Sequence, residues 1–180
     1  MIYNKLNEAF DFVGVINKER YEQFHNHDFL DDYQSIFVVG LAYPNVFLPQ
    51  KRDSLVASMY TYGYDYHDVL REIINVSLKD EKGYLALVDN HEINERKCLE
   101  LTGLAYLGRN NLMINKEYGS YFFVALVLTK ERHDEVIIIN DDSCGDCDLC
   151  IRACPVNALT GGYNVSKCMS ALNQTKKVYP

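Results

Sequence analysis

The chain has 180 residues, a hydrophobic share of 48%, a charged share of 24% and a net charge of −7. This length suits one domain, or one domain plus a small module. The acidic balance argues against a broad nucleic-acid surface, because phosphate binding needs an excess of Lys and Arg. No apolar run reaches the roughly 18 residues of a membrane span, and the first residues lack the order of a secretory signal. We therefore expect a cytoplasmic protein without membrane contact.

Hydrophobic periodicity predicts helices and strands in mixed order. Along the chain we expect a helix over 2–10, strands over 12–16 and 35–44, a helix over 65–80, a strand over 84–89, a helix over 93–104, a β-hairpin of 110–114 with 120–129, and a strand over 135–139. A strict β–α–β alternation is missing, and the hairpin implies antiparallel pairing. The pattern therefore favours an α+β fold, with a mixed α/β sandwich-like domain over 1–140. Cysteine and glycine become dense after Asp141, so a small module is expected over 141–180.

The module opens on a run of four cysteines followed by proline, with the spacing C-x2-C-x2-C-x3-C-P: Cys144, Cys147, Cys150 and Cys154-Pro155. This is the spacing of bacterial ferredoxins, in which consecutive thiolates wrap around an iron–sulfur cluster. Zinc usually takes Cys-x2-Cys pairs from two separated places, so zinc is the weaker alternative. A reducing compartment also disfavours disulfides. The run therefore predicts a ferredoxin-like 4Fe-4S module.

The number of cysteines leaves the cluster count open. In two-cluster ferredoxins the fourth cysteine of the run ligates the other cluster. The first three cysteines would then ligate one cluster, and Cys154 would ligate the second together with Cys168. The module supplies five thiols, fewer than two clusters need. Either the protein continues past Pro180 with a second cysteine motif, which the ending favours, or one cluster is closed by Cys154 or Cys168. We expect Cys98, far upstream, to be a small buried hydrophobe.

Four further stretches, taken with the cysteine run, resemble the epoxyqueuosine reductase family and its shorter relatives. The resemblance covers about residues 35 to 172 and is carried by "YTYGYDYHDVL" (60–70), "VDNHEINER" (88–96), "TGLAYLGRNNLMI" (102–114) and "EYGSYFFVALVLT" (117–129). It implies the cobalamin-linked reduction of the epoxide of epoxyqueuosine in tRNA, with iron–sulfur clusters passing electrons to the corrin. It also implies an electron-donating reductase, flavodoxin or ferredoxin as partner, and cobalamin between the first domain and the module.

The resemblance matches Asp89 with the acid that protonates the departing oxygen. Opening an epoxide reductively leaves an alkoxide, and a positioned acid makes that leaving group easier. By its position alone, Asp89 is a strand-end acid that either faces a cleft or caps the next helix. Candidate cofactor-binding residues are Tyr66, His67, Arg96, Arg109, Gly119 and Ser120.

Each of these has an ordinary interpretation as well, such as a helix-start histidine, a helix-surface arginine or a hairpin turn. Two other functions therefore stay open. One is a ferredoxin-like electron carrier without cobalamin or tRNA activity, and the other is a zinc-binding interaction protein.

Overall fold

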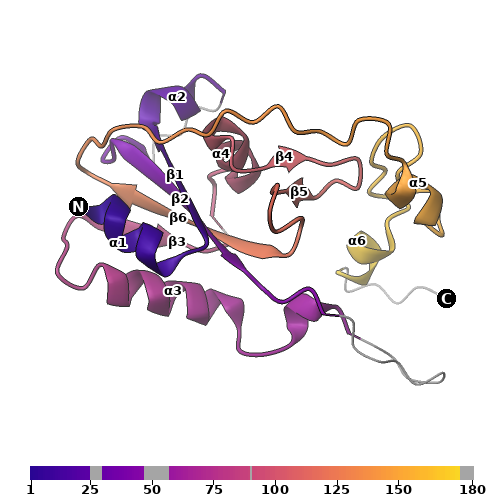
Figure 1. Cartoon of the computed structure of the whole chain (residues 1–180), viewed down its shortest axis with the longest axis horizontal. Coiled ribbons are helices and arrows are strands. Elements are labelled where there is room, and N and C mark those ends of the chain that lie inside the picture. Colours follow the sequence, from indigo (N-terminus) through magenta and orange to yellow (C-terminus); the bar gives the residue numbers. More distant parts are fainter. Residues whose placement is uncertain (25–29, 47–56, 90, 175–180) are drawn as a thin grey trace.

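The computed structural model describes residues 1–24, 30–46, 57–89 and 91–174. A four-stranded sheet in the order β1-β2-β6-β3 forms its centre, and every pairing in it is antiparallel (Figure 1). The strands are β1 (Phe12–Asn17), β2 (Ser35–Ala42), β3 (Tyr84–Leu87) and β6 (Phe122–Thr129). No described helix is both long and apolar enough to cross a membrane.

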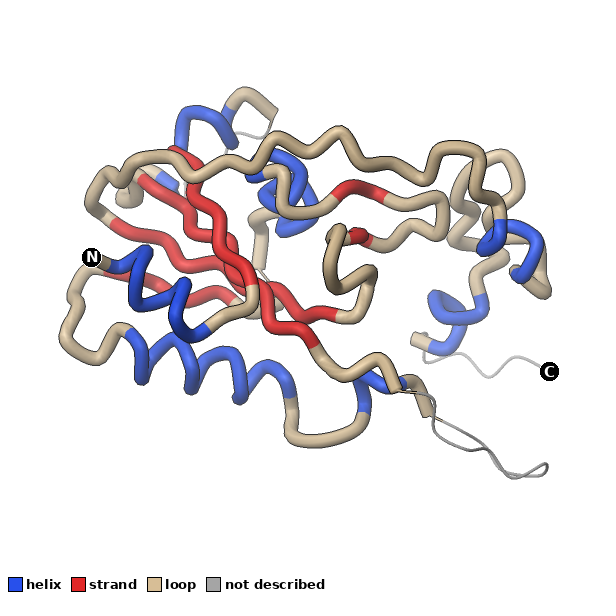
Figure 2. Tube along the Cα trace, viewed as in Figure 1, coloured by secondary structure: helices blue, strands red, loops and turns tan. Residues whose placement is uncertain are grey.

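Successive residues of each strand point to opposite faces of the sheet, and in this sheet both faces are buried. In β2, Phe37 and Val39 enter one core, while Ile36 and Val38 enter the other. Helices α1 (Ile2–Ala9) and α3 (Tyr66–Ser77) cover the first face. Helices α2 (Lys18–Glu22) and α4 (Glu95–Thr102) cover the second, beside a small ribbon of β4 (Tyr106–Leu107) and β5 (Met113–Ile114) (Figure 2). The predicted sandwich-like α+β domain is thus confirmed.

Helix α3 shows why the sequence takes this form. Leu70, Ile74 and Leu78 recur every four residues and are fully buried. Burial of each such side chain contributes about 1.5–3 kcal/mol. Asp65 caps the helix by accepting a hydrogen bond from the backbone N–H of His67 at 2.9 Å. The cap fixes where the helix begins, and with it the direction in which Tyr66 and His67 project.

Beyond the sheet lie a short 3-10 helix, η2 (Met59–Thr61), and the cysteine-rich segment with α5 (Leu149–Ala153) and α6 (Met169–Asn173). Figure 1 shows this segment at the opposite end of the molecule from the amino terminus. The unit boundary near residue 140 stays a prediction.

Two strand predictions are wrong. Residues 110–114 and 120–129 do not form a hairpin with each other: β5 pairs with β4, while β6 pairs with β2 and β3. Both edges of β6 are occupied by β2 and β3, and the connecting segment between β5 and β6 makes one isolated bridge, between Asn115 and Gly119. Residues 135–139 also form no strand. Val136 makes one isolated bridge to Val15 of β1, and the chain then leaves the sheet.

Residues 133–142 instead form a strap that leads from the sheet to the cysteines (Figure 1). Glu135 receives two hydrogen bonds from Arg20, at 3.0 and 2.7 Å. Further along, the backbone N–H of Ile138 donates to the Thr102 carbonyl at 2.8 Å. Gly103, which ends α4 with a φ of 68°, lies directly under this contact, and a Cβ there would overlap the Ile138 carbonyl oxygen. The strap's path therefore requires glycine at position 103.

We expect Gly103→Ala to destabilise the protein more than Gly83→Ala does. Both glycines have a positive φ, but a Cβ at Gly83 would meet only the flexible Lys130 side chain at 3.9 Å. Gly83→Ala, the control, should lose about 1–2 kcal/mol of unfolding free energy through backbone strain alone. In Gly103→Ala the steric clash should add about 1–3 kcal/mol to that loss. Urea unfolding measures both. Equal losses of stability would show that the strap tolerates a side chain there.

Candidate functional site

Asp89 lies just after β3 and meets two side chains from the start of α3. Its backbone has a φ of 49°, a left-handed conformation that is uncommon for aspartate. The Tyr66 hydroxyl donates to Asp89 Oδ2 at 3.1 Å, and His67 Nε2 lies 3.4 Å from the same oxygen. The other ring nitrogen of His67 lies 2.7 Å from Asp65 Oδ1. The imidazole therefore bridges two carboxylates.

The contacts within this cluster shift the pKa values of three of its members. The hydrogen bond to Asp65, and secondarily Asp89, raises the pKa of His67 against an opposing effect of desolvation. The same contact lowers the pKa of Asp65. Burial, followed by the Asp89 carboxylate, raises the pKa of Tyr66 to about 12. These shifts favour the protonated form of the His67 imidazole, and Tyr66 stays a neutral phenol that donates to Asp89.

A stack of rings connects this cluster to an aromatic cavity. The Tyr66 ring lies on Phe123 with centroids 4.4 Å apart and planes 3° from parallel, and it contacts His67 at 3.9 Å. Phe123 in turn touches Tyr43 at 4.8 Å. These last two rings line a cavity of about 620 Å³, whose other walls are Ser58, Met59, Tyr60, Leu112, Ser120, Tyr121 and Phe122. The acid cluster and the cavity therefore share the Phe123 ring as a common wall.

Asp89 does not cap helix α4. Asn94 holds that role, accepting from the Lys97 backbone N–H at 3.1 Å. Asp89 and Arg96 instead line one small cavity of about 340 Å³. The Arg96 guanidinium donates to Asn111 Oδ1 at 3.4 Å, in the loop between β4 and β5. Arg96 therefore connects the acid cluster with that loop.

The first cysteine of the run contacts the β4–β5 ribbon. The backbone N–H of Arg109 donates to Cys144 Sγ at 3.4 Å, and the Arg109 guanidinium donates to the Cys147 carbonyl at 3.2 Å. Burial, and next the neighbouring Cys144 thiol, raise the pKa of Tyr106. The ribbon therefore binds the start of the cysteine loop by both backbone and side-chain groups.

The last two cysteines form a second group. Backbone N–H groups, chiefly that of Ala158 at 3.2 Å, lower the pKa of Cys154. The N–H of Ala171 and the Tyr163 hydroxyl lower the pKa of Cys168. The two thiols are close enough for the charge of Cys168 to influence Cys154. The stabilised thiolates suit soft metal ions. How the cysteines divide between one cluster and two stays a prediction.

The thiols are not drawn together around one point. Within residues 1–24, 30–46, 57–89 and 91–174, no three His, Cys, Asp or Glu side chains are placed to hold a metal ion. Cys98 is fully buried in the core, as expected, and burial raises the pKa of its thiol.

The predicted site residues thus fall into connected sets. Asp89, Tyr66 and His67 meet directly, Arg96 lines a cavity with Asp89, and Arg109 contacts the cysteines. Gly119, with a φ of 60°, shapes the turn that delivers Ser120 to the aromatic cavity.

Sequence reasoning missed the roles of Asp65 and Tyr163. The spacing of Asp65 and His67, two residues apart at a helix start, is a signal that could have revealed their contact. Tyr163 carries no such local signal.

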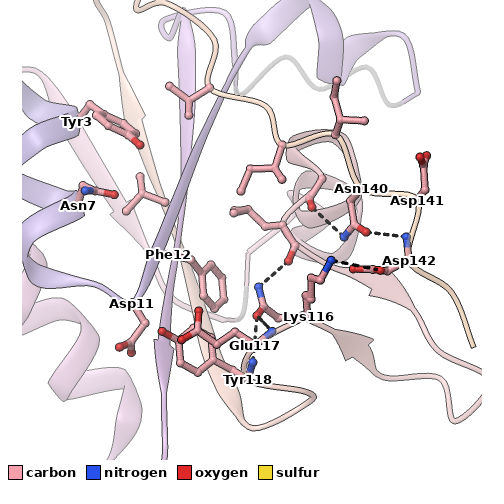
Figure 3. Close-up of a pocket in the computed structure, with 17 residues that line it drawn as sticks. Tyr3, Asn7, Asp11, Phe12, Lys116, Glu117, Tyr118, Asn140, Asp141 and Asp142 are labelled. Atoms are coloured by element: carbon pink, nitrogen blue, oxygen red, sulfur yellow. Dashed lines mark hydrogen bonds and ion pairs between the residues drawn. The ribbon is translucent and has the colours of Figure 1, made fainter.

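Another cavity, of about 670 Å³, lies apart from these residues (Figure 3). Its wall is formed by the end of α1, the turn after β5 and the strap, and it carries the acids Asp11, Glu117, Asp141 and Asp142 beside Lys116. It contains none of the predicted site residues.

Comparison with known proteins agrees with the cysteine pattern. Residues 137–160 match the family model described as a 4Fe-4S binding domain. Epoxyqueuosine reductase from Bacillus subtilis is 32% identical over 160 residues, which cover 82% of the chain and 41% of that enzyme. The enzyme from Lactococcus garvieae is 31% identical over 185 residues, covering 96% and 52%. The chain is a relative of the epoxyqueuosine reductases. It spans about half the length of the curated relatives it matches.

The solved reductases share the fold. The structure of the epoxyqueuosine reductase from Streptococcus thermophilus matches 99% of this chain and 58% of its own with a TM-score of 0.79, at 24% identity. An epoxyqueuosine reductase bound to an epoxyqueuosine-modified tRNA-Tyr stem loop matches the same shares with a TM-score of 0.76, at 25% identity. The resemblance to this family and the α+β fold class are therefore confirmed.

We expect Asp65→Asn to lower the pKa of His67 toward its ordinary value of about 6.5. Asparagine caps a helix as well as aspartate does, so α3 should persist while the charge is lost. The raised pKa of His67 means that the pair stabilises the folded state fully below about pH 6.5, down to where Asp65 itself protonates. This contribution disappears as pH rises through the His67 pKa.

NMR titration of the His67 ring and unfolding at several pH values measure both effects. The control is Asp68→Asn, in the same helical turn, where the aspartate is exposed and lies 3.8 Å from Arg71. An equal shift of the His67 pKa in the two variants would contradict the proposed pairing.

Proposed function

We propose that this chain is an iron–sulfur, cobalamin-linked reductase of the epoxyqueuosine reductase type. Its substrate would be the epoxide of epoxyqueuosine in tRNA, and its electrons would come from a reduced flavodoxin, ferredoxin or dedicated reductase. The proposal also places it in the cytoplasm, where cysteine thiols stay reduced. Its support is the family relationship together with the arrangement of the site.

The observation that carries the proposal is the position of the loop between β4 and β5. At one end of the loop Arg109 contacts Cys144 and Cys147, and three residues later Leu112 lines the aromatic cavity. A hydrogen bond from Gly108 N to Leu112 O at 2.8 Å closes the loop between these two points. One short, closed segment therefore separates the cysteines from the cavity, which is the arrangement that electron transfer to a bound cofactor needs.

The residues of the aromatic cavity fit a corrin. Tyr43, Tyr121 and Phe123 offer flat apolar surfaces to a large ring, and the Ser120 hydroxyl offers a hydrogen bond to its amide groups. Gly119 lets the backbone turn close to that surface. Arg109 and Arg96 lie on the side of the cysteines and of Asp89, respectively. A bound cobalamin would supply a cobalt centre able to deliver electrons to the substrate.

Asp89 is the proton donor in this proposal. Removing an epoxide oxygen to leave an alkene breaks two C–O bonds, consumes two electrons and two protons, and releases water. Asp89 in its acid form gives a proton to the departing oxygen, which lowers the barrier to C–O cleavage. The Asp65–His67 pair, at 2.7 Å, stands next to Asp89 and holds a proton that can reload it. Tyr66 orients the carboxyl through its 3.1 Å hydrogen bond.

The substrate carrier follows from a relative, which binds an epoxyqueuosine-modified tRNA-Tyr stem loop. With a net charge of −7, this chain has little electrostatic attraction for the whole tRNA. We therefore infer that recognition is confined to the modified base and its near neighbours.

The test is conversion of a modified tRNA-Tyr stem loop by protein reconstituted without oxygen and supplied with cobalamin and reductant. Mass spectrometry of the nucleosides measures the loss of the epoxide oxygen. Asp89→Asn should lower the rate by about 100-fold or more, because general acid catalysis contributes about 10²–10⁴. Its iron content should stay at the wild-type level, and the exposed Asp68→Asn should keep full activity.

Two outcomes would overturn the proposal. Wild-type activity in Asp89→Asn would remove Asp89 as the acid. Full iron content without cobalamin binding or turnover would leave a ferredoxin-like electron carrier.

A further inference from the structure

Three tyrosines are exposed in the short loop that leads into α3. Their exposed fractions are 53% for Tyr60, 51% for Tyr62 and 92% for Tyr64. One exposed tyrosine is ordinary on a protein surface, whereas large rings gathered in one place mark a binding surface. The loop is therefore a candidate surface for contact with another molecule.

Hydrogen bonds at both ends hold the backbone of this loop in place. At its start, the hydroxyl and the backbone N–H of Thr61 both donate to the Ser58 carbonyl, at 2.7 and 2.9 Å, and close η2. At its end, Asp65 caps α3. Between these two points Gly63 turns the chain with a φ of 105°. An ordered backbone thus presents the rings, which reduces the conformational entropy that is lost when they bind a ligand.

Two of the three tyrosines line a small groove beside the acid cluster. The groove has a volume of about 210 Å³, and Tyr60 and Tyr64 share its lining with Tyr66 and His67. The side chains of Tyr66 and His67 contact Asp89, and Tyr60 also lines the aromatic cavity. The groove therefore lies next to both the acid and the cavity.

The lining of the groove suits an uncharged planar ring better than a phosphate group. Neither Lys nor Arg is among its lining residues in the described part of the chain, and the His67 imidazole already lies 2.7 Å from Asp65. Proteins hold unpaired nucleobases by stacking them on tyrosine and other aromatic rings. Stacking does not require the excess of cationic side chains that this chain, with a net charge of −7, lacks.

We propose that Tyr60 and Tyr64 form a stacking subsite for an unpaired nucleobase that neighbours the modified nucleoside of the tRNA. The inference rests on the proposed function, which supplies the tRNA substrate, and it names the contact by which an acidic chain holds that substrate. The neighbouring base occupies the groove while the modified nucleoside reaches Asp89. Contacts at this remote base help to place the epoxide at the acid, because binding away from the reacting atoms fixes their orientation.

The test is the affinity of the reconstituted protein for the modified tRNA-Tyr stem loop, measured by fluorescence anisotropy. Tyr60→Ala and Tyr64→Ala should each weaken binding by about 5- to 100-fold, the range expected for the loss of one base–aromatic stack. Tyr64→Phe should bind as the wild type does, because stacking needs only the ring. The control is Tyr62→Ala, which removes an exposed ring of the same loop outside the groove and should leave the affinity unchanged.

Binding and turnover together separate this inference from the proposed function. Weaker binding in the two alanine variants, with no reduction of the epoxide by the wild type, would overturn the proposed reaction and support the subsite. Unchanged affinity in Tyr60→Ala and Tyr64→Ala, or an equal loss in Tyr62→Ala, would overturn the subsite alone. Slower electron uptake from the donor protein with unchanged stem-loop affinity would also overturn it, because the tyrosines would then bind the donor. A wild type that does not bind the stem loop would overturn both the subsite and the tRNA substrate.

Discussion

Strand β6 is the element on which the rest of the structure depends. It pairs with β2 along all of its residues and with β3 along its second half. Its side chains alternate between the two cores, with Ala125 and Val127 on one face and Leu126 and Leu128 on the other. Its first residues place Phe123 under Tyr66. The same strand therefore holds the two helical layers together and supplies the common wall of the acid cluster and the aromatic cavity.

The site combines three pieces that are distant in sequence. The start of α3 brings an imidazole and a phenol, the end of β3 brings the carboxyl of Asp89, and the β4–β5 ribbon brings hydrogen-bond donors to the cysteine loop. A common structural feature sets the position of each piece: a helix cap, a strand end and a short β-ladder, respectively. In the proposed function, proton delivery and electron delivery would approach the aromatic cavity from different elements, which would keep the two processes separately adjustable.

The sequence was most informative where chemistry depends on local spacing. The cysteine run could be recognised because its ligands are two or three residues apart, and the amphipathic helix at 66–77 could be recognised because Leu70 and Ile74 follow helical periodicity. Asp89 was found only through the family resemblance. Its contact with Tyr66 joins residues 23 apart, and no local pattern encodes it.

The errors share one cause, which is pairing between distant segments. The predicted hairpin of 110–114 with 120–129 was wrong because β6 finds better partners in β2 and β3, which complete a sheet buried on both sides. The bond from the Arg109 N–H to Cys144, 35 residues away, was likewise invisible, because it depends on the strap that crosses α4. Periodicity reports which face of an element is buried, but it does not report which element covers it.

The central claim, that this fold unites an iron–sulfur centre with a cobalamin, is tested most directly by metal analysis. Iron, labile sulfide, zinc and cobalt should be counted after anaerobic reconstitution in the presence of cobalamin. The account predicts about four or more irons per chain, matching sulfide, and stoichiometric cobalt. Zinc with neither iron nor cobalt would contradict it.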